Sequence, residues 1–155
     1  MKKYFKNKFK IMKKYPNITV SIIFRYKDKI LILKHKGNVF SFPGGRMEWG
    51  ESIFGALNRE LKEELNYSLD SLRGEPELFG VWNYISKNRK RHSVFINYIH
   101  QLNKKPNLSS PENLQLLWLT KKESISKNII KDEKFLNKIF NWRRSNNFKN
   151  KKGRV

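Results

Sequence analysis

A cluster of acidic residues preceded by glycines is the part of this sequence whose residue types and spacing suit chemistry. Eight of the 13 acidic residues lie between positions 48 and 77 of the 155-residue chain. Such clustering needs a physical explanation in a protein whose formal net charge is +21. Carboxylates held close together repel one another, so at neutral pH they require a countercharge. The cluster is therefore a candidate cation-binding and catalytic site.

A helix predicted over residues 52–65 places three of these carboxylates beside an apolar stripe. At about 100° per residue, Glu64 falls inside the stripe, and Glu60 and Glu63 fall near its rim. Glutamates of an ordinary surface helix point away from the apolar face. The stripe consists of Ile53, Leu57, Leu61 and Leu65.

A glycine pair precedes the helix in the sequence. Gly44 and Gly45 permit a turn that other residues disfavour, and this turn can bring main-chain groups to the start of the helix. Phosphate groups are readily bound at helix starts. We therefore expect Gly44, Gly45 and Arg46 to contact the phosphates of a substrate.

Two kinds of countercharge fit the cluster. Arg59 and Lys62 are close enough in sequence to form ordinary surface ion pairs with the glutamates. A divalent cation is the alternative, and a site that offers only oxygen ligands suits Mg²⁺ or Mn²⁺ better than zinc. The adjacent glycine turn favours the cation.

The spacing of these residues resembles the signature of the Nudix hydrolase family. That signature is a glycine, five residues, a glutamate, seven residues, and then Arg-Glu-aliphatic-any-Glu-Glu-any-Gly-aliphatic. Two positions differ, because Asn66 stands where the family has glycine and Tyr67 where an aliphatic residue is usual. Asparagine also tolerates left-handed backbone geometry, so the helix can still end there. The matching positions are Gly45, Glu51, Arg59, Glu60, Leu61, Glu63 and Glu64.

The resemblance implies a fold, a reaction and a set of roles. The implied fold is a single-domain α/β/α sandwich with a mixed β-sheet. The implied reaction is hydrolysis of a diphosphate linkage in a nucleoside diphosphate derivative, a nucleotide-like small molecule. Arg59 would orient the carboxylates, and Glu51 would brace the glycine loop against the helix. The implied ligands of Mg²⁺, which Mn²⁺ can replace, are the Gly45 carbonyl, Glu60, Glu63 and Glu64.

The residue that takes the proton from the attacking water differs among members of this family. Glu63 and Glu112 are the candidates here. Glu112 lies in a proline-containing loop, where several relatives place an additional acidic ligand or base. A solvated loop glutamate is an equally good interpretation of Glu112.

Four aromatic residues are candidates for contact with a nucleobase. Trp49, next to the glutamate cluster, either stacks on a base or packs against the helix. Trp82, Tyr84 and Phe95 lie on predicted strands, where aromatic side chains more often belong to the core.

Composition limits the class of protein. The chain has the size of one ordinary domain. It contains no cysteine, which excludes disulfides and thiolate metal sites. No apolar run approaches the roughly 18 residues that a membrane helix needs. We expect a cytoplasmic protein that does not interact with membranes.

Hydrophobic patterns elsewhere predict strands around the helix. A loop is expected to begin at the glycine pair. A second helix is predicted over residues 131–144, because Phe135, Ile139 and Trp142 recur at helical spacing. Strands are predicted over residues 18–26, 30–35, 40–42, 77–85, 92–102 and 114–119.

Basic residues concentrate at both ends of the chain. Residues 1–16 are predicted to form a basic arm or a first helix, residues 17–144 the Nudix hydrolase domain, and residues 145–155 a disordered basic tail. This charge either attracts RNA and nucleotides or reflects a lysine-rich composition without a specific function.

Three functions follow from these observations as alternatives. The first is hydrolysis of small nucleotides. The second is removal of a 5′ diphosphate or cap from RNA that is bound by the basic ends. The third is a catalytically silent nucleic-acid-binding module, which the retained acidic positions disfavour. A homodimer is compatible with each alternative.

Overall fold

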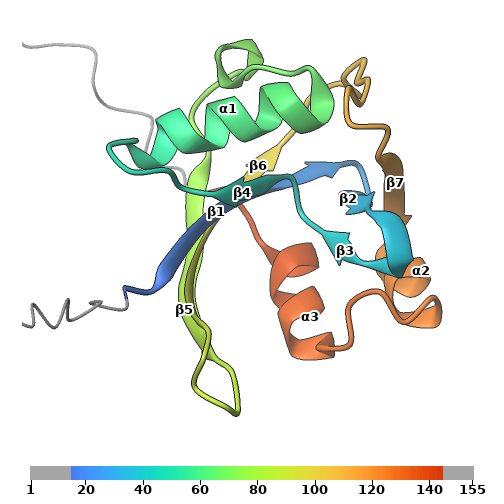
Figure 1. Cartoon of the computed structure of the whole chain (residues 1–155). Helices are drawn as coiled ribbons and strands as arrows, with labels where there is room; N and C mark the ends of the chain where they lie inside the picture. Colours follow the sequence, from blue (N-terminus) through green and yellow to red (C-terminus); the bar gives the residue numbers. More distant parts are fainter. Residues whose placement is uncertain (1–14, 145–155) are drawn as a thin grey trace, which may run out of the picture.

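The computed structural model describes residues 15–144, which form a seven-stranded sheet with helices on both faces (Figure 1). The strands are β1 (Asn17–Tyr26), β2 (Lys29–Lys34), β3 (Phe40–Ser41), β4 (Gly44–Arg46), β5 (Glu77–Ile85), β6 (His92–Gln101) and β7 (Gln115–Thr120). The helices are α1 (Ile53–Leu65), α2 (Lys121–Ser126) and α3 (Glu133–Asn141), with short 3-10 turns at Lys36–Asn38 and Leu69–Ser71.

Strand β1 lies at the centre of the sheet. It pairs in parallel with β6 and antiparallel with β2 and β4. Strand β5 continues the sheet beyond β6, and β7 and β3 pair with β2, all antiparallel. One parallel pair among antiparallel ones makes the sheet mixed. The predicted α/β/α sandwich with a mixed sheet in a single domain is thus confirmed.

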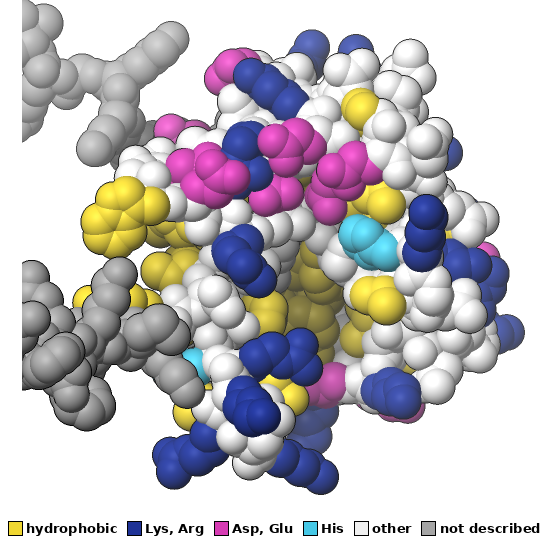
Figure 2. Space-filling model, in the orientation of Figure 1, with side chains coloured by type: hydrophobic (Ala, Val, Ile, Leu, Met, Phe, Trp, Pro, Cys, Tyr) yellow, Lys and Arg dark blue, Asp and Glu magenta, His cyan; other side chains and the backbone are white. Residues whose placement is uncertain are grey.

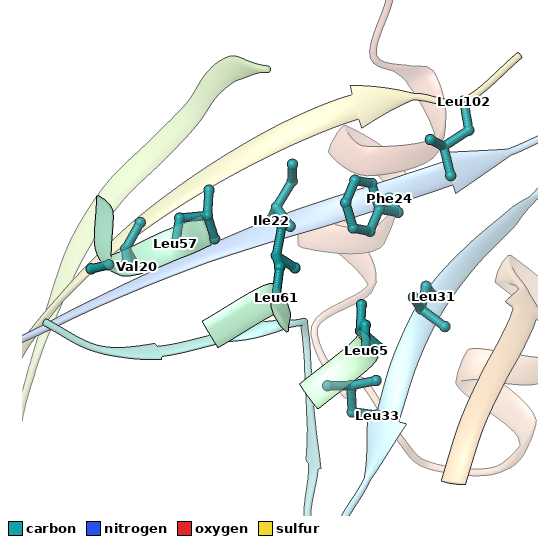
Figure 3. Close-up of a cluster of buried hydrophobic side chains, with 10 residues drawn as sticks. Val20, Ile22, Phe24, Leu31, Leu33, Leu57, Leu61, Leu65 and Leu102 are labelled. Carbon is teal, nitrogen blue, oxygen red and sulfur yellow. The ribbon is translucent and has the colours of Figure 1, made fainter. Parts of the chain in front are cut away.

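Alternating residues of β1 contribute to two hydrophobic layers. Val20, Ile22 and Phe24 point toward α1 and pack with its leucines (Figure 3). Burying each of these side chains contributes roughly 1.5–3 kcal/mol. On the opposite face, Ile23 packs in the layer that includes buried residues of α3. Thr19 and Ser21, whose positions alternate with Ile23, line a pocket instead of the core.

Arg25 fixes the end of α3 against the sheet. Its side chain is only 8% exposed. Nη1 donates to the carbonyl oxygens of Ile139 at 3.1 Å and Trp142 at 2.8 Å, and the guanidinium lies over the Trp142 ring. A cation at a helix C-terminus is electrostatically favourable. The other end of α3 is capped by Asp132, which accepts from the Phe135 amide at 3.0 Å.

The observed elements correct three sequence predictions. The glycine pair belongs to a short strand, β4, because it bonds along β1. The predicted helix over residues 131–144 is too long, since the backbone leaves helical geometry at Trp142. Helix α2 was missed, although Thr120 and Glu123 form a capping box at its start.

The predicted terminal segments lie mostly outside the described part of the chain. The structure describes neither residues 1–14 nor residues 145–155, so the arm and the tail stay predictions. Among residues 15–144, each helix is too short or too polar to span a bilayer.

Candidate active site

Helix α1 begins and ends where its capping residues require. The Ser52 hydroxyl oxygen accepts from the Gly55 amide at 3.0 Å. At the other end, Asn66 adopts φ 49° and ψ 43°, and its amide donates to the carbonyls of Leu61 and Lys62. Asparagine thus takes the left-handed position that glycine occupies in the family signature. The departure at this position leaves the helix end intact.

The glycine pair brings β4 against both β1 and α1. Gly44 has φ +132°, and a Cβ there would collide with the backbone of Val20 and Ser21. A Cβ on Gly45 would collide with the carboxylate of Glu60. Side chains are therefore excluded at both positions, and the backbone lies directly on the acidic cluster.

Glu64 is buried at the centre of the cluster, as the helical periodicity predicted. It is 5% exposed, and its Oε2 accepts from the Gly44 amide at 2.8 Å. Burial raises the pKa of Glu64 to about 8; the Gly44 hydrogen bond lowers it, and the charges of Glu60, Glu112 and Glu63 raise it further. A proton or a bound cation must therefore compensate this carboxylate at neutral pH.

Arg59 connects the helix to the loop before it. Its Nε and Nη2 donate to the two oxygens of Glu51 at 2.7 and 2.9 Å. Nη1 donates to Glu60 at 2.8 Å and to Glu63 at 3.3 Å, and Nη2 also donates to the Arg46 carbonyl at 3.0 Å. Hydrogen bonds from Arg59, followed by the Glu48 amide, lower the pKa of Glu51 to about 2.

Acidic side chains gather on one face of the molecule, with a hollow beside them (Figure 2). Hydrogen bonds to Arg59 hold Glu51, Glu60 and Glu63 together. Within residues 15–144, however, no three acidic or histidine side chains are arranged as a ready-made metal site. Glu60 and Glu63 instead accept hydrogen bonds from Arg59. A divalent ion would have to draw their oxygens toward Glu64, and these oxygen donors are of the type that Mg²⁺ prefers.

Glu112 lies near the cluster, although it is distant in sequence. Its side chain is exposed in the loop before β7. Its charge nevertheless contributes to the raised pKa of Glu64, which places it within electrostatic reach of the buried carboxylate. The structure thus brings together Glu51, Arg59, Glu60, Glu63, Glu64 and Glu112.

A pocket of about 520 Å³ adjoins the carboxylates. It shares Gly44 with them, since this residue lines the pocket and donates its amide to Glu64. Trp82 and Phe95 line it as well, whereas Tyr84 is 53% exposed and lies outside. Three further phenyl rings line the pocket: Phe40, Phe42 and Phe135.

Polar groups in this pocket were missed by the sequence analysis. Asn97 is 4% exposed and accepts a hydrogen bond from the Ser21 hydroxyl through Oδ1, which leaves its NH₂ group as the donor it offers to the pocket. Asp132 lies at the start of α3, on the pocket's edge. The sequence signal that could have identified these groups was a polar residue, Asn97 or Ser21, inside an apolar strand.

Trp49 does not pack against the helix. The indole is fully exposed on the loop between β4 and α1. Packing, one of the two interpretations of Trp49, is therefore wrong.

Comparison with known proteins agrees with the fold and the motif. The model of the NUDIX domain matches residues 15–142. An ADP-ribose pyrophosphatase of Methanocaldococcus jannaschii is 32% identical over 89 residues, which are 55% of this chain and 50% of that protein. The chain therefore spans about half the length of this curated relative.

Solved structures show the same fold at low sequence identity. A NUDIX hydrolase from Nitrosomonas europaea has a TM-score of 0.61 and 22% identity, with 81% of this chain and 86% of that chain covered. An Ap4A hydrolase of C. elegans has a TM-score of 0.62 and 19% identity, with coverages of 80% and 96%. With the NUDIX match extending over most of its length, the chain belongs to the Nudix hydrolase family.

Proposed function

We propose that this protein hydrolyses a diphosphate linkage in a nucleoside diphosphate derivative and that it requires Mg²⁺ or Mn²⁺. The observation that supports this most is the buried carboxylate of Glu64, which is surrounded by other acidic groups next to the glycine backbone of β4. A strongly basic protein gains nothing from this repulsion unless a cation is bound there.

The metal would be held by the Gly45 carbonyl, Glu60, Glu63 and Glu64. When bound, a divalent ion neutralises phosphate charge and lowers the pKa of a water molecule. Arg59 would hold the loop and α1 at a fixed distance through its bonds to Glu51 and Arg46. The side chain of Arg46 is proposed to contact the substrate phosphates, and Gly44 and Gly45 are proposed to hold the backbone of β4 beside them, since the Gly44 amide donates to Glu64.

The reaction is a simple exchange of bonds. The water oxygen forms a bond to one phosphorus, the bridging P–O bond breaks, and a carboxylate takes the proton of the water. Glu63, which is half-exposed and held by Arg59, and Glu112, which is exposed, are the proposed bases. A pH–rate profile of Glu63→Gln and Glu112→Gln distinguishes them, because only loss of the base removes the acidic limb.

The aromatic pocket is the proposed site of the nucleoside. Its rings can stack on a planar base, and the Asn97 amide and Asp132 carboxylate can hydrogen-bond to the edge of the base. The curated relative is named an ADP-ribose pyrophosphatase, which supports ADP-ribose as the first substrate to assay.

The test is an assay of ADP-ribose, other diphosphate-linked nucleotides and nucleoside triphosphates, each with Mg²⁺ and with chelator. We expect turnover only with metal. Glu63→Gln should lower kcat by at least about tenfold, equal to a loss of about 1.4 kcal/mol of transition-state stabilisation. Glu75→Gln, which changes an exposed glutamate away from the cluster, is the matched control. Equal kcat in Glu63→Gln and Glu75→Gln would contradict the metal assignment.

A further inference from the structure

The hairpin formed by β5 and β6 concentrates positive charge at its turn. Residues 87–91, here called the hairpin tip, include four lysines and arginines, and all are exposed. Figure 1 shows this turn projecting from the body of the molecule. Residues 78–111 contain no acidic residue and six basic ones: Lys87, Arg89, Lys90, Arg91, Lys104 and Lys105.

An aromatic path joins the pocket to the hairpin tip. Trp82 pairs with Phe95 across the two strands, and both line the pocket. Tyr84 lies two residues further along β5 and therefore on the same face, opposite Ser93. It is 53% exposed, so its ring is accessible to a ligand.

The space-filling view shows the order of these features on one face. Acidic side chains lie at one end, a hollow with a hydrophobic floor lies in the middle, and basic side chains gather over the β5–β6 turn (Figure 2). A ligand with a polyphosphate at one end, a nucleoside next to it, and further phosphates and bases beyond would match this order.

We infer that the β5–β6 hairpin binds a single-stranded RNA chain whose 5′ polyphosphate end is held at the carboxylates. This inference rests on the proposed function and names a substrate class for the same site. The first nucleoside occupies the pocket, a following base stacks on Tyr84, and backbone phosphates contact Lys87, Lys90 and Arg91. RNA is the nucleic acid to expect, because its synthesis starts with a triphosphate end.

Charge favours RNA over a second copy of this chain on this surface. The edge strand β5 also exposes apolar side chains on the face opposite Tyr84, such as Val81 and Ile85, and its free edge could pair with a second sheet edge. Two hairpin tips brought together would repel, whereas a polyanion gains affinity from each released counterion. Exposed aromatic rings beside basic side chains are the combination that binds single strands.

The hydrogen bonds of the turn do not come from its lysine and arginine side chains. They come from the backbone and from the side chains of Ser86 and Asn88. Arg89 has φ 54° and is left unchanged in the test. The triple variant Lys87→Gln, Lys90→Gln, Arg91→Gln therefore removes three charges and keeps every hydrogen bond of the turn.

The experiment compares a 5′-triphosphorylated RNA of about ten nucleotides with the matching nucleoside triphosphate. We expect the triple variant to lower kcat/KM for the RNA by at least about tenfold and to change that for the mononucleotide by less than about twofold. The slope of log affinity against log salt should decrease by about 0.7 for each RNA phosphate that the variant no longer neutralises. The matched control is Lys121→Gln, Lys122→Gln, Lys127→Gln, with equal charge loss on exposed residues at α2.

Tyr84 provides a second, uncharged test. Tyr84→Ala should weaken RNA binding by at least about fivefold, whereas Tyr84→Phe, which keeps the stacking ring, should retain it. Binding is measured by fluorescence anisotropy in the Glu63→Gln background, in which slow turnover leaves most of the RNA intact during the measurement. Absence of turnover with every substrate would reject the proposed function, while this binding measurement would still test the hairpin.

Two results would overturn the inference. One is an equal loss of RNA affinity in the hairpin and α2 variants, which would mean that only net charge matters. The other is a wild-type protein that sediments as a dimer and a triple hairpin variant that sediments as a monomer but binds RNA with unchanged affinity. That result would assign the surface to a second copy of the chain.

Discussion

At the scale of single residues, Glu64 carries the strongest electrostatic conflict of the cluster. Burial raises its pKa to about 8, and Glu60, Glu112 and Glu63 raise it further, against the Gly44 hydrogen bond. The unfolded value is 4.5. The folded state therefore holds the proton more tightly. The resulting stabilisation is complete below about pH 4.5 and is lost as the pH rises through about 8.

Glu64→Gln should therefore stabilise the metal-free protein at high pH while abolishing turnover. The amide oxygen can still accept from Gly44, and no charge is buried. With chelator present, we expect a higher urea midpoint than wild type at pH 9 and a similar midpoint at pH 5. Adding Mg²⁺ should raise the wild-type midpoint more than that of the variant. A lower midpoint for Glu64→Gln at pH 9 would contradict this explanation.

The residues of the acidic cluster could be predicted because their relations are local. Glu60, Glu63 and Glu64 lie on one helix, and helical periodicity alone places Glu64 in the apolar face, where the structure buries it. The pair between Ser21 and Asn97 could not be predicted. These residues are 76 positions apart, and their contact depends on the parallel pairing of β1 with β6.

At the scale of elements, the position of α3 decides the shape of the pocket. This helix contributes Phe135, and its cap contributes Asp132. Its C-terminal carbonyls are held by Arg25, from the central strand. The buried guanidinium thus adds a polar link between sheet and pocket wall to the apolar packing of Leu136 and Ile139.

Arg25→Met should destabilise the protein and loosen the pocket. The carbonyls of Ile139 and Trp142 would lose their charged donor, which costs about 1–3 kcal/mol for a buried group. We expect a lower Tm and, because the pocket wall shifts, a rise in KM that exceeds the fall in kcat. Arg25→Lys keeps the charge but not the planar fork. Its Tm and KM should lie between those of the wild type and of Arg25→Met. An unchanged KM would show that the hydrogen bonds of Arg25 to the end of α3 do not affect substrate binding.

Element positions could be predicted better than element ends. The strand predicted over residues 77–85 coincides with β5, because its β-branched and aromatic residues are bounded by turn residues. The end of α3 was misplaced, since Trp142 continues the apolar spacing but packs after the helix has ended. Strand β4 was interpreted as a loop, because glycine weakens a strand pattern and only its pairing with β1 identifies it.

At the scale of the whole molecule, His100 makes the stability of the fold depend on pH. It is 3% exposed at the end of β6. Burial lowers its pKa, and the charge of Arg144 lowers it further. A hydrogen bond with the backbone of Glu75 and the charge of Glu77 raise the pKa but do not outweigh burial. The unfolded chain then binds the proton more tightly than the folded one. The contribution to stability is present above about pH 6.5 and is lost as the pH falls below it.

His100→Asn should therefore flatten the dependence of stability on pH. We expect the wild-type urea midpoint to fall relative to that of the variant between about pH 7.5 and 5.5. Comparison of the two proteins cancels the contributions of Glu64 and Glu51, which both retain. His92→Asn, which removes an exposed histidine from the same strand, is the control.

The parallel pairing of β1 with β6 also has a consequence for biosynthesis. The register joins Asn17 to Ser93 and Arg25 to Gln101, so the central strand lacks one neighbour until about residue 101 has left the ribosome. At roughly 5–20 residues per second, the nascent chain exposes this apolar segment for several seconds. Helix α1, with its own caps, can form earlier. The strand made first is thus completed late, and during that interval its apolar side chains lack part of their final packing.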